Sequence, residues 1–210
     1  MNPPPDYRRA YYQLRRGEEV TDKHLLTPLK ELPFRNAFKF SIDTEEVKKV
    51  VVKHVEFLKE VFDRQFVRFE HIGSTSMKGM PGTAMPDLIV YIDPFPPSNE
   101  SLAKLEENEI KFLGIPPHST KKGDMFFLRQ SDEPIPDNDY SNVVLHLVSK
   151  DSDDLDHLIK FRNLVNSNPK VFDEYKKHKL AEYDDPNIQN MLEYKILKGK
   201  KIDALLEEFS

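Results

Sequence analysis

The sequence predicts an α+β domain built from one N-terminal helix, a mixed β-sheet of about five strands and three C-terminal helices. Apolar residues recur every three or four positions over 43–62 and again after 152, as in amphipathic helices. Between these regions lie short apolar runs typical of strands. The 210 residues suffice for one domain with a substantial core, and no apolar run approaches the ~18 residues of a membrane span.

The first predicted helix begins near Asp43, a suitable N-cap residue with Glu46 three positions later. The positions that form its apolar stripe are Val47, Val50, Val51, His54, Val55, Leu58 and Phe62. This spacing predicts a helix that packs one face on the domain and leaves its lysines in water.

Five short segments have the composition of strands, and one helix lies among them. The predicted strands are Gln65 to Ile72, Pro86 to Ile92, Ile110 to Ile115, Met125 to Gln130 and Asn142 to Val148, and the predicted helix is Ser98 to Asn108. The second and the last strand are apolar almost throughout, which is typical of central strands buried on both faces.

Helical periodicity returns at Ser152 and continues to the end of the chain. The three helices contain Leu155 to Arg162, a segment that starts at Pro169 as its first helical residue, and Ile188 to Phe209. Residues 1–40 are Pro-rich and aromatic, so we predict an N-terminal arm that is partly disordered and packs in part onto a domain of residues 41–210.

Composition excludes several functional classes. With 31 Lys and Arg against 36 Asp and Glu, the net charge is −5, which argues against a nucleic-acid-binding protein. The absence of cysteine excludes thiol catalysis, disulfides and thiolate metal sites. The N-terminal residues carry no apolar signal core, so the expected localisation is cytoplasmic, and no membrane partner is expected.

The segment between the first two predicted strands contains the clearest candidate for a ligand site. Gly73 allows close approach of a ligand to the backbone, while the hydroxyls of Ser74, Thr75 and Ser76 and the ammonium group of Lys78 are suited to phosphate oxygens. The spacing is not that of a P-loop. A Gly- and Ser-rich loop between strands is also the usual form of a plain connection, so this reading stays open.

These residues resemble the GrpB family, a group within the nucleotidyltransferase-like superfamily. The resemblance rests on Glu70-His71-Ile72-Gly73-Ser74-Thr75-Ser76, followed by Gly79 and by Asp87 in an apolar strand. It extends over roughly residues 66–205 through Gly114-Ile115-Pro116, Phe126-Phe127-Leu128-Arg129, His146, the helix His157 to Leu164, and Tyr194 with Lys198. The aromatic segment that the family has before its first helix is not evident in residues 36–47.

The resemblance implies a nucleotidyltransferase-like sheet with Gly73 and Ser74 at a phosphate-facing turn and Asp87 as a ligand of Mg²⁺ beside a bound nucleotide. Two-metal transfer chemistry needs carboxylates around metals about 3.5–4 Å apart. In an active transferase of this kind the second acid follows the first by two residues, but here that position is Ile89. Asp93 lies roughly 20 Å further along the strand, too far to complete the pair. Glu70 is the nearest replacement, so the loop favours binding while the missing acid argues against the usual transfer reaction.

Other titratable residues are candidates for the same site. Arg129, Arg162 and Lys198 could hold an anion, and Arg162 could instead form a structural ion pair with Asp87. His71 and His146 are either core residues or acid–base groups.

Three hypotheses therefore remain. The first is an enzyme that holds a nucleotide or another phosphorylated metabolite at Gly73 and Ser74, with Asp87 and Glu70 as metal ligands and His71 or His146 in proton transfer. The second is a non-catalytic module that binds the same small phosphorylated ligand. The third is a structural domain whose arm binds a partner, and the sequence leaves the oligomeric state open.

Overall fold

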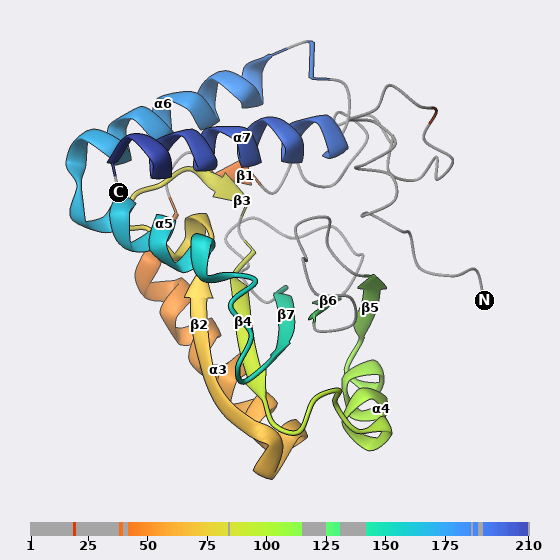
Figure 1. Ribbon diagram of the computed structural model, residues 1–210. Coiled ribbons are helices and arrows are strands. Elements are labelled where there is room, and N and C mark those ends of the chain that lie inside the picture. Colours follow the sequence, from red (N-terminus) through yellow and green to blue (C-terminus); the bar gives the residue numbers. More distant parts are fainter. Residues whose placement is uncertain are drawn as a thin grey trace.

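The computed structural model describes residues 19, 38–39, 42–83, 85–114, 125–130, 142–185, 187–188 and 191–209. These residues form a central sheet with helices on both faces and a helical layer across one end (Figure 1). The α+β class predicted from the sequence is confirmed. The predicted arm 1–40 lies almost entirely outside the described residues, so its role stays a prediction.

Helix α3 (Thr44–Phe62) begins where the sequence predicts. The Asp43 carboxylate accepts hydrogen bonds from the backbone amides of Glu45 and Glu46, at 3.0 and 3.3 Å. These bonds satisfy two of the amide groups that have no partner inside the first turn of a helix. The apolar stripe faces the sheet, and Val47 and Leu58 are fully buried.

The main sheet has the strand order β2-β4-β7-β6-β5. Its strands are β2 (Phe66–Ile72), β4 (Asp87–Ile92), β7 (Val144–Ser149), β6 (Met125–Gln130) and β5 (Ile110–Gly114). Strands β4 and β7 run parallel, and the other neighbouring pairs are antiparallel. A separate antiparallel pair joins β1 (Phe38–Lys39) to β3 (Gly82–Thr83). The sequence does not predict this pair, because two residues per strand are too few to form a recognisable pattern.

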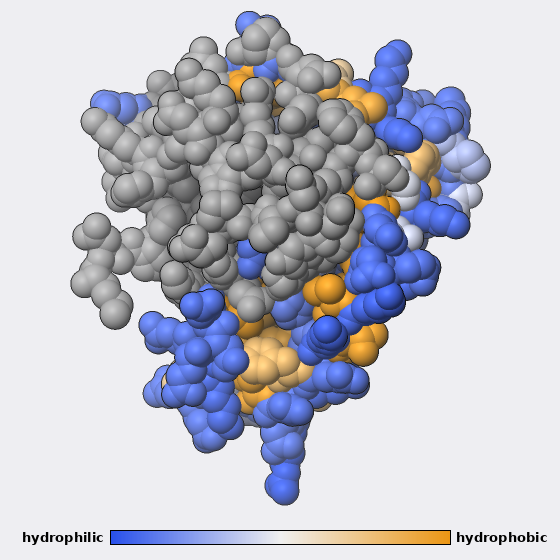
Figure 2. Space-filling model, turned by 180° about the vertical axis from the view of Figure 1, so that it is seen from behind, coloured by the Kyte–Doolittle hydropathy of each residue, from blue (hydrophilic) through white to orange (hydrophobic). Residues whose placement is uncertain are grey.

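One face of the sheet packs on α3 and on α4 (Asn99–Glu107). Leu88, Val90, Leu145 and Leu147 form this core with the apolar stripe of α3. At 25 cal/mol per Å² of buried apolar surface, such clusters supply most of the favourable free energy of folding. Figure 2 shows this side, where hydrophobic and charged side chains both reach the surface in its lower half.

The opposite face packs on α5 (Asp156–Ser167) through Ile89, Tyr91 and Val148. Helices α6 (Pro169–Asp184) and α7 (Met191–Phe209) lie side by side across the end of the sheet where β2 stops and β4 starts (Figure 1). The Asn168 side chain caps α6 at its amide groups, with Pro169 as the first helical residue as predicted. The layer of α6 and α7 therefore covers the turn that carries the candidate site.

None of the helices in the described part of the chain combines the length and apolar character needed to cross a bilayer.

Candidate functional site

The turn after β2 brings Gly73 against the first residue of β4. Gly73 has φ +72°, a conformation that side chains other than glycine rarely adopt. A Cβ atom at this position would collide with a carboxylate oxygen of Asp87. Ile72 and Asp87 are direct partners in the β2–β4 register, so the turn and the acid face the same end of the sheet. The pairing of the loop with Asp87 that the sequence suggested is thus present.

Three hydroxyl groups in the turn have different surroundings. Thr75 is buried, and its hydroxyl lies 2.9 Å from Nε2 of His71. The Ser76 hydroxyl donates to the carbonyl of Gly73 at 2.7 Å. Both side chains therefore shape the turn from inside, whereas Ser74 faces Gly82: a Cβ on Gly82 would meet the Ser74 hydroxyl oxygen. Ser74 is the hydroxyl directed at the helical layer.

Lys179 of α6 reaches the same place from the opposite side. Its side chain is only 2% exposed, and its Nζ would lie 2.9 Å from a Cβ on Gly82, next to Ser74. Burial, with a smaller effect of Lys198, lowers the pKa of Lys179 to about 7, while Asp87 and Glu182 act in the opposite direction. The amine of Lys179, which is shielded from solvent, thus faces the turn and Asp87.

Glu182 lies one helical turn after Lys179 and is also buried. Burial raises its pKa to about 7, opposed by Lys198 and Lys179. One of its carboxylate oxygens lies 3.1 Å from Nε2 of His178. Lys179 and Glu182 are therefore two buried groups of opposite charge type, each of which favours the charged form of the other, and both have a pKa near neutrality.

Lys198 of α7 completes the basic side of this cluster, because it influences the pKa of both Lys179 and Glu182. Two buried tyrosines close the cluster: the Tyr175 ring lies 5.6 Å from Nζ of Lys179, and Tyr194 is the residue four positions before Lys198. Burial raises the pKa of both phenols, so both remain protonated donors at neutral pH.

His146 lies on the same face of the sheet as Asp87. It is the β7 partner of Ile89, it is 4% exposed, and its Nε2 lies 4.0 Å from a carboxylate oxygen of Asp87. The structure thus brings together Gly73, Ser74, Asp87, His146 and Lys198 among the residues predicted from the sequence, and it adds Lys179 and Glu182 to them.

Arg162 takes a different partner from the one that the sequence suggested. Its guanidinium donates to the Glu70 carboxylate and to the backbone carbonyl of His71, both at 2.8 Å. The suggested ion pair between Arg162 and Asp87 is therefore wrong, because α5 packs beside β2 and places Arg162 next to Glu70. Glu70 is also 3.6 Å from Arg68, so its carboxylate is occupied by cations.

His71 points to the other face of the sheet from Asp87, since its register partner is Leu88 of the α3 core. Burial, reinforced by the nearby Arg162 charge, lowers the pKa of His71 to about 4. His71 is thus neutral at pH 7, and its position holds the turn through Thr75.

Two further predicted residues lie elsewhere. Lys78 is exposed and lines a second pocket with Asn166, Phe172 and Asp173, away from Asp87. Arg129 pairs in register with Val144, which in turn pairs with Asp87, so its backbone lies in the same row of the sheet. The side chain of Arg129 lies outside the described part of the chain.

A family model described as GrpB protein matches residues 41–208. The chain belongs to the GrpB family. The crystal structure titled "conserved protein GrpB" from Enterococcus faecalis has the same fold, with a TM-score of 0.56 at 18% identity, over 82% of this chain and 99% of that one. No protein with a curated function is detectably similar to the chain.

Among the described residues, the donor set around the turn does not fit a two-metal centre. Within the residues that the structure describes, no three His, Asp or Glu side chains are arranged to hold a metal ion. Glu70, the suggested second ligand beside Asp87, is held by Arg162. Mg²⁺ requires several oxygen ligands in near-octahedral geometry, and Asp87 alone supplies at most two.

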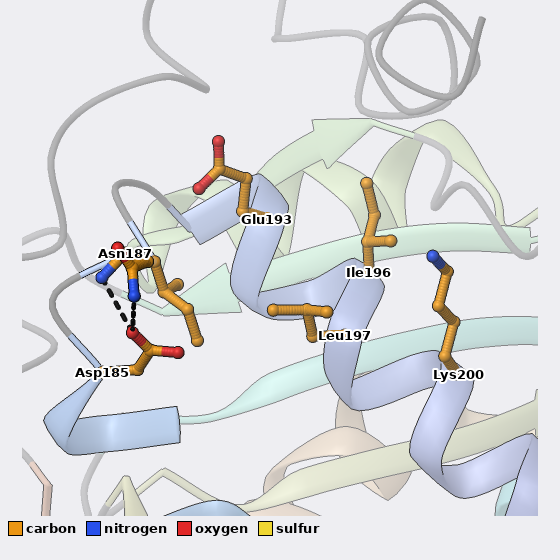
Figure 3. Close-up of a pocket in the computed structure, with 7 residues that line it drawn as sticks. Asp185, Asn187, Glu193, Ile196, Leu197 and Lys200 are labelled. Atoms are coloured by element: carbon orange, nitrogen blue, oxygen red, sulfur yellow. Dashed lines mark hydrogen bonds between the residues drawn. The ribbon is translucent and has the colours of Figure 1, made fainter. Parts of the chain in front are cut away.

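An open pocket of about 540 Å³ lies outside this cluster (Figure 3). Its described lining comes from the α6–α7 connection and one side of α7: Asp185, Asn187, Ile188, Glu193, Ile196, Leu197 and Lys200. The Asp185 carboxylate accepts hydrogen bonds from the backbone amide and the side-chain amide of Asn187, and these bonds order the α6–α7 connection at the edge of the pocket. None of these described lining residues is a site residue predicted from the sequence.

Sequence reasoning missed Lys179 and Glu182, although a signal was present. Val171 and Tyr175 are buried on the inner face of α6, and Lys179 and Glu182 continue the same spacing of four, four and three residues. Charged residues at positions of an apolar stripe indicate a buried polar cluster, because an isolated charge there would be too costly.

Proposed function

We propose that the chain binds a small phosphorylated metabolite, with nucleotides as the first class to test, at the turn formed by Gly73 and Ser74. The observation that carries this proposal is the buried ammonium group of Lys179, which faces Ser74 and Asp87 across Gly82. The backbone amides of the turn and the Ser74 hydroxyl are donors suited to phosphate oxygens. The phosphate-facing role of this turn in nucleotidyltransferase-like proteins, implied by the family resemblance, supports the same reading.

The charges in the cluster fit an anionic ligand. The pKa of Lys179 is lowered to about 7 and that of Glu182 is raised to about 7, so part of the molecules carry a neutral lysine and a neutral acid at pH 7. A phosphate group beside Lys179 favours the charged ammonium, since opposite charges raise the pKa of a lysine. Binding above pH 7 therefore takes up a proton.

Binding without chemistry is favoured over metal-dependent transfer. Glu70 is occupied by Arg162, and Asp87 is not joined by a second described carboxylate that could complete a metal pair. The proposal therefore contains no step that passes through Mg²⁺. A transferase remains the second candidate because Asp87 opens β4 beside the turn and His146 lies 4.0 Å from it.

The test is thermal unfolding with ATP, ADP, inorganic phosphate and adenosine, each with and without Mg²⁺. We expect ATP, ADP or phosphate to stabilise the chain without Mg²⁺, by about 2.7 kcal/mol at a hundredfold excess over Kd, and adenosine to have no effect. Lys179→Met and Ser74→Ala should lose this shift, whereas Lys78→Met, in the same turn but exposed toward the second pocket, should keep it. Urea unfolding of each variant separates loss of binding from loss of fold.

Two outcomes would contradict the proposal: no shift with any phosphorylated compound, or an equal loss in Lys78→Met. If Mg²⁺ instead supports turnover of a nucleotide that Asp87→Asn abolishes, the second candidate replaces the first. Isothermal calorimetry of the wild type in buffers of different ionisation enthalpy measures the proton uptake, which should be larger above pH 7 than below it, where Lys179 is already charged.

A further inference from the structure

Within the described part of the chain, β2 is an edge strand of the main sheet, because β4 is its one partner there and β2 ends the strand order. Several of its side chains are exposed, among them Val67 at 47% and Phe69 at 37%. An edge strand with exposed apolar side chains is a surface on which another strand can pair. Val67 and Phe69 are two of the four large hydrophobic side chains found exposed in the described part of the chain.

The hydrogen bonds of β4 reveal which backbone groups of β2 point outward. The carbonyl of Pro86 accepts a hydrogen bond from the amide of Val144 in β7, and the carbonyl of Ile92 accepts one from the amide of Lys150, just after β7. Even-numbered residues of this strand thus bond toward β7, and odd-numbered ones bond toward β2. Their partners on β2 are Arg68, Glu70 and Ile72, so the backbone groups of Phe69 and His71 face away from β4.

The outward carbonyl of His71 is already used, because it accepts from Arg162. At the other end, the register shift between Phe66 and Arg68 interrupts regular pairing. The stretch that remains for an incoming strand is therefore short and centred on Phe69.

We propose that a second copy of this chain pairs with β2 in antiparallel orientation, about a two-fold axis at Phe69. This register places Arg68 of each copy opposite Glu70 of the other. An axis at Arg68 or Glu70 would set like charges directly opposite each other, which destabilises antiparallel pairs. The charges therefore favour the register in which Phe69 of one copy lies opposite Phe69 of the other. A two-fold interface of this kind uses the same surface on both copies.

The outward backbone groups fit the same register. Phe69 of each copy exchanges two N–H···O=C bonds with its counterpart, since its amide and carbonyl both face outward. The exposed phenylalanine rings then cover each other. This inference does not depend on the proposed ligand site, which lies at the end of the sheet beneath α6 and α7.

Light scattering after size exclusion tests the proposal on the full chain over a wide range of concentrations. We expect the mass to rise toward twice the 24.6 kDa of one chain. Phe69→Asp, which places two carboxylates on the axis, should halve that mass. Val52→Asp is the matched control, because Val52 is 54% exposed on α3 and off the strand, and its mass should stay that of the dimer.

Cysteine cross-linking provides a second measurement, since the chain has no cysteine of its own. Phe69→Cys should be joined into a covalent dimer by a short bis-maleimide, because directly opposite residues have Cβ atoms about 4.5–5.5 Å apart, slightly more than a disulfide spans. Val52→Cys should remain monomeric on a denaturing gel. A mass of one chain at every concentration, an undiminished dimer in Phe69→Asp, or equal cross-linking of both cysteines would each overturn the proposal.

Discussion

Gly73 is the residue on which the geometry of the turn depends. Its φ of +72° and the contact between Asp87 and a Cβ at this position both exclude larger residues. We predict that Gly73→Ala lowers the free energy of unfolding by about 1–3 kcal/mol, the usual cost of such backbone strain.

Urea unfolding measures this change, and Gly199→Ala is the control. Gly199 lies inside α7 with open space around its Cα, so alanine there should be neutral or stabilise by up to about 1 kcal/mol. Equal stability of the two variants would show that the turn tolerates a side chain.

Lys179 predicts a specific dependence of stability on pH. Because its pKa in the folded chain is about 7 and that of a free lysine is 10.5, the unfolded state binds more protons between these values. Its contribution to stability therefore rises with pH from about 7 to 10.5, by up to about 1.4 kcal/mol per pH unit. The contribution of Glu182 to stability falls as the pH rises from 4.5 to 7, because the folded state binds more protons than the unfolded state in this range.

Unfolding free energies of the wild type and Lys179→Met, measured from pH 7 to 10, check this dependence. The difference between the two curves should change steadily over that range, and Lys160→Met, exposed on α5, should leave the wild-type curve unchanged. Parallel curves for the wild type and Lys179→Met would mean that the lysine is not desolvated.

Part of the candidate site could be predicted from residue types alone. The Gly-Ser pair and Asp87 were found because they are close in sequence and chemically distinctive. Lys179 and Glu182 come from a helix about a hundred residues away, so no local pattern links them to the turn. Residue types alone also cannot show whether Glu70 or Asp87 lies beside Arg162, because both carboxylates are near the same end of the sheet.

At the scale of elements, the link between α5 and β2 depends on Arg162. Its bonds to Glu70 and to the carbonyl of His71 join the helix to the strand just before the turn. We predict that Arg162→Ala costs about 1–3 kcal/mol, because it removes the donor to the His71 carbonyl and leaves Glu70 with the more distant Arg68, at 3.6 Å. Ligand affinity should change less than twofold in the folded variant, since Arg162 does not face the turn.

Urea unfolding and ligand titration of the same preparation separate these effects. Lys160→Ala, exposed on the same helix, should stay within about 0.5 kcal/mol of the wild type. A large loss of affinity in Arg162→Ala with unchanged stability would place Arg162 in the ligand site instead.

Most elements were predictable because their signals are local. Helix α3 was found from its cap and its stripe, and β4 and β7 from their uninterrupted apolar runs. The pairing of β1 with β3 was missed, since register between two-residue strands depends on contacts that no short pattern encodes.

For the whole molecule, the central pair β4 and β7 should be the most stable part. Val90 and Leu147 are fully buried between two layers of helices. We predict that their amide protons exchange with solvent only through global unfolding, whereas the last turn of α7, with Glu207 and Glu208, exchanges by local fraying. Hydrogen exchange followed by NMR measures both, and fast exchange at Val90 would contradict the prediction that β4 and β7 are the most stable part of the molecule.

The burial of Lys179 also makes its amine a reporter of motion in the native protein. Amine-reactive reagents modify surface lysines directly, but they can reach this nitrogen only when α6 lifts from the turn. The rate of its acylation, followed by peptide mass spectrometry, would therefore measure how often that layer opens, and an occupant that holds the layer closed would slow it.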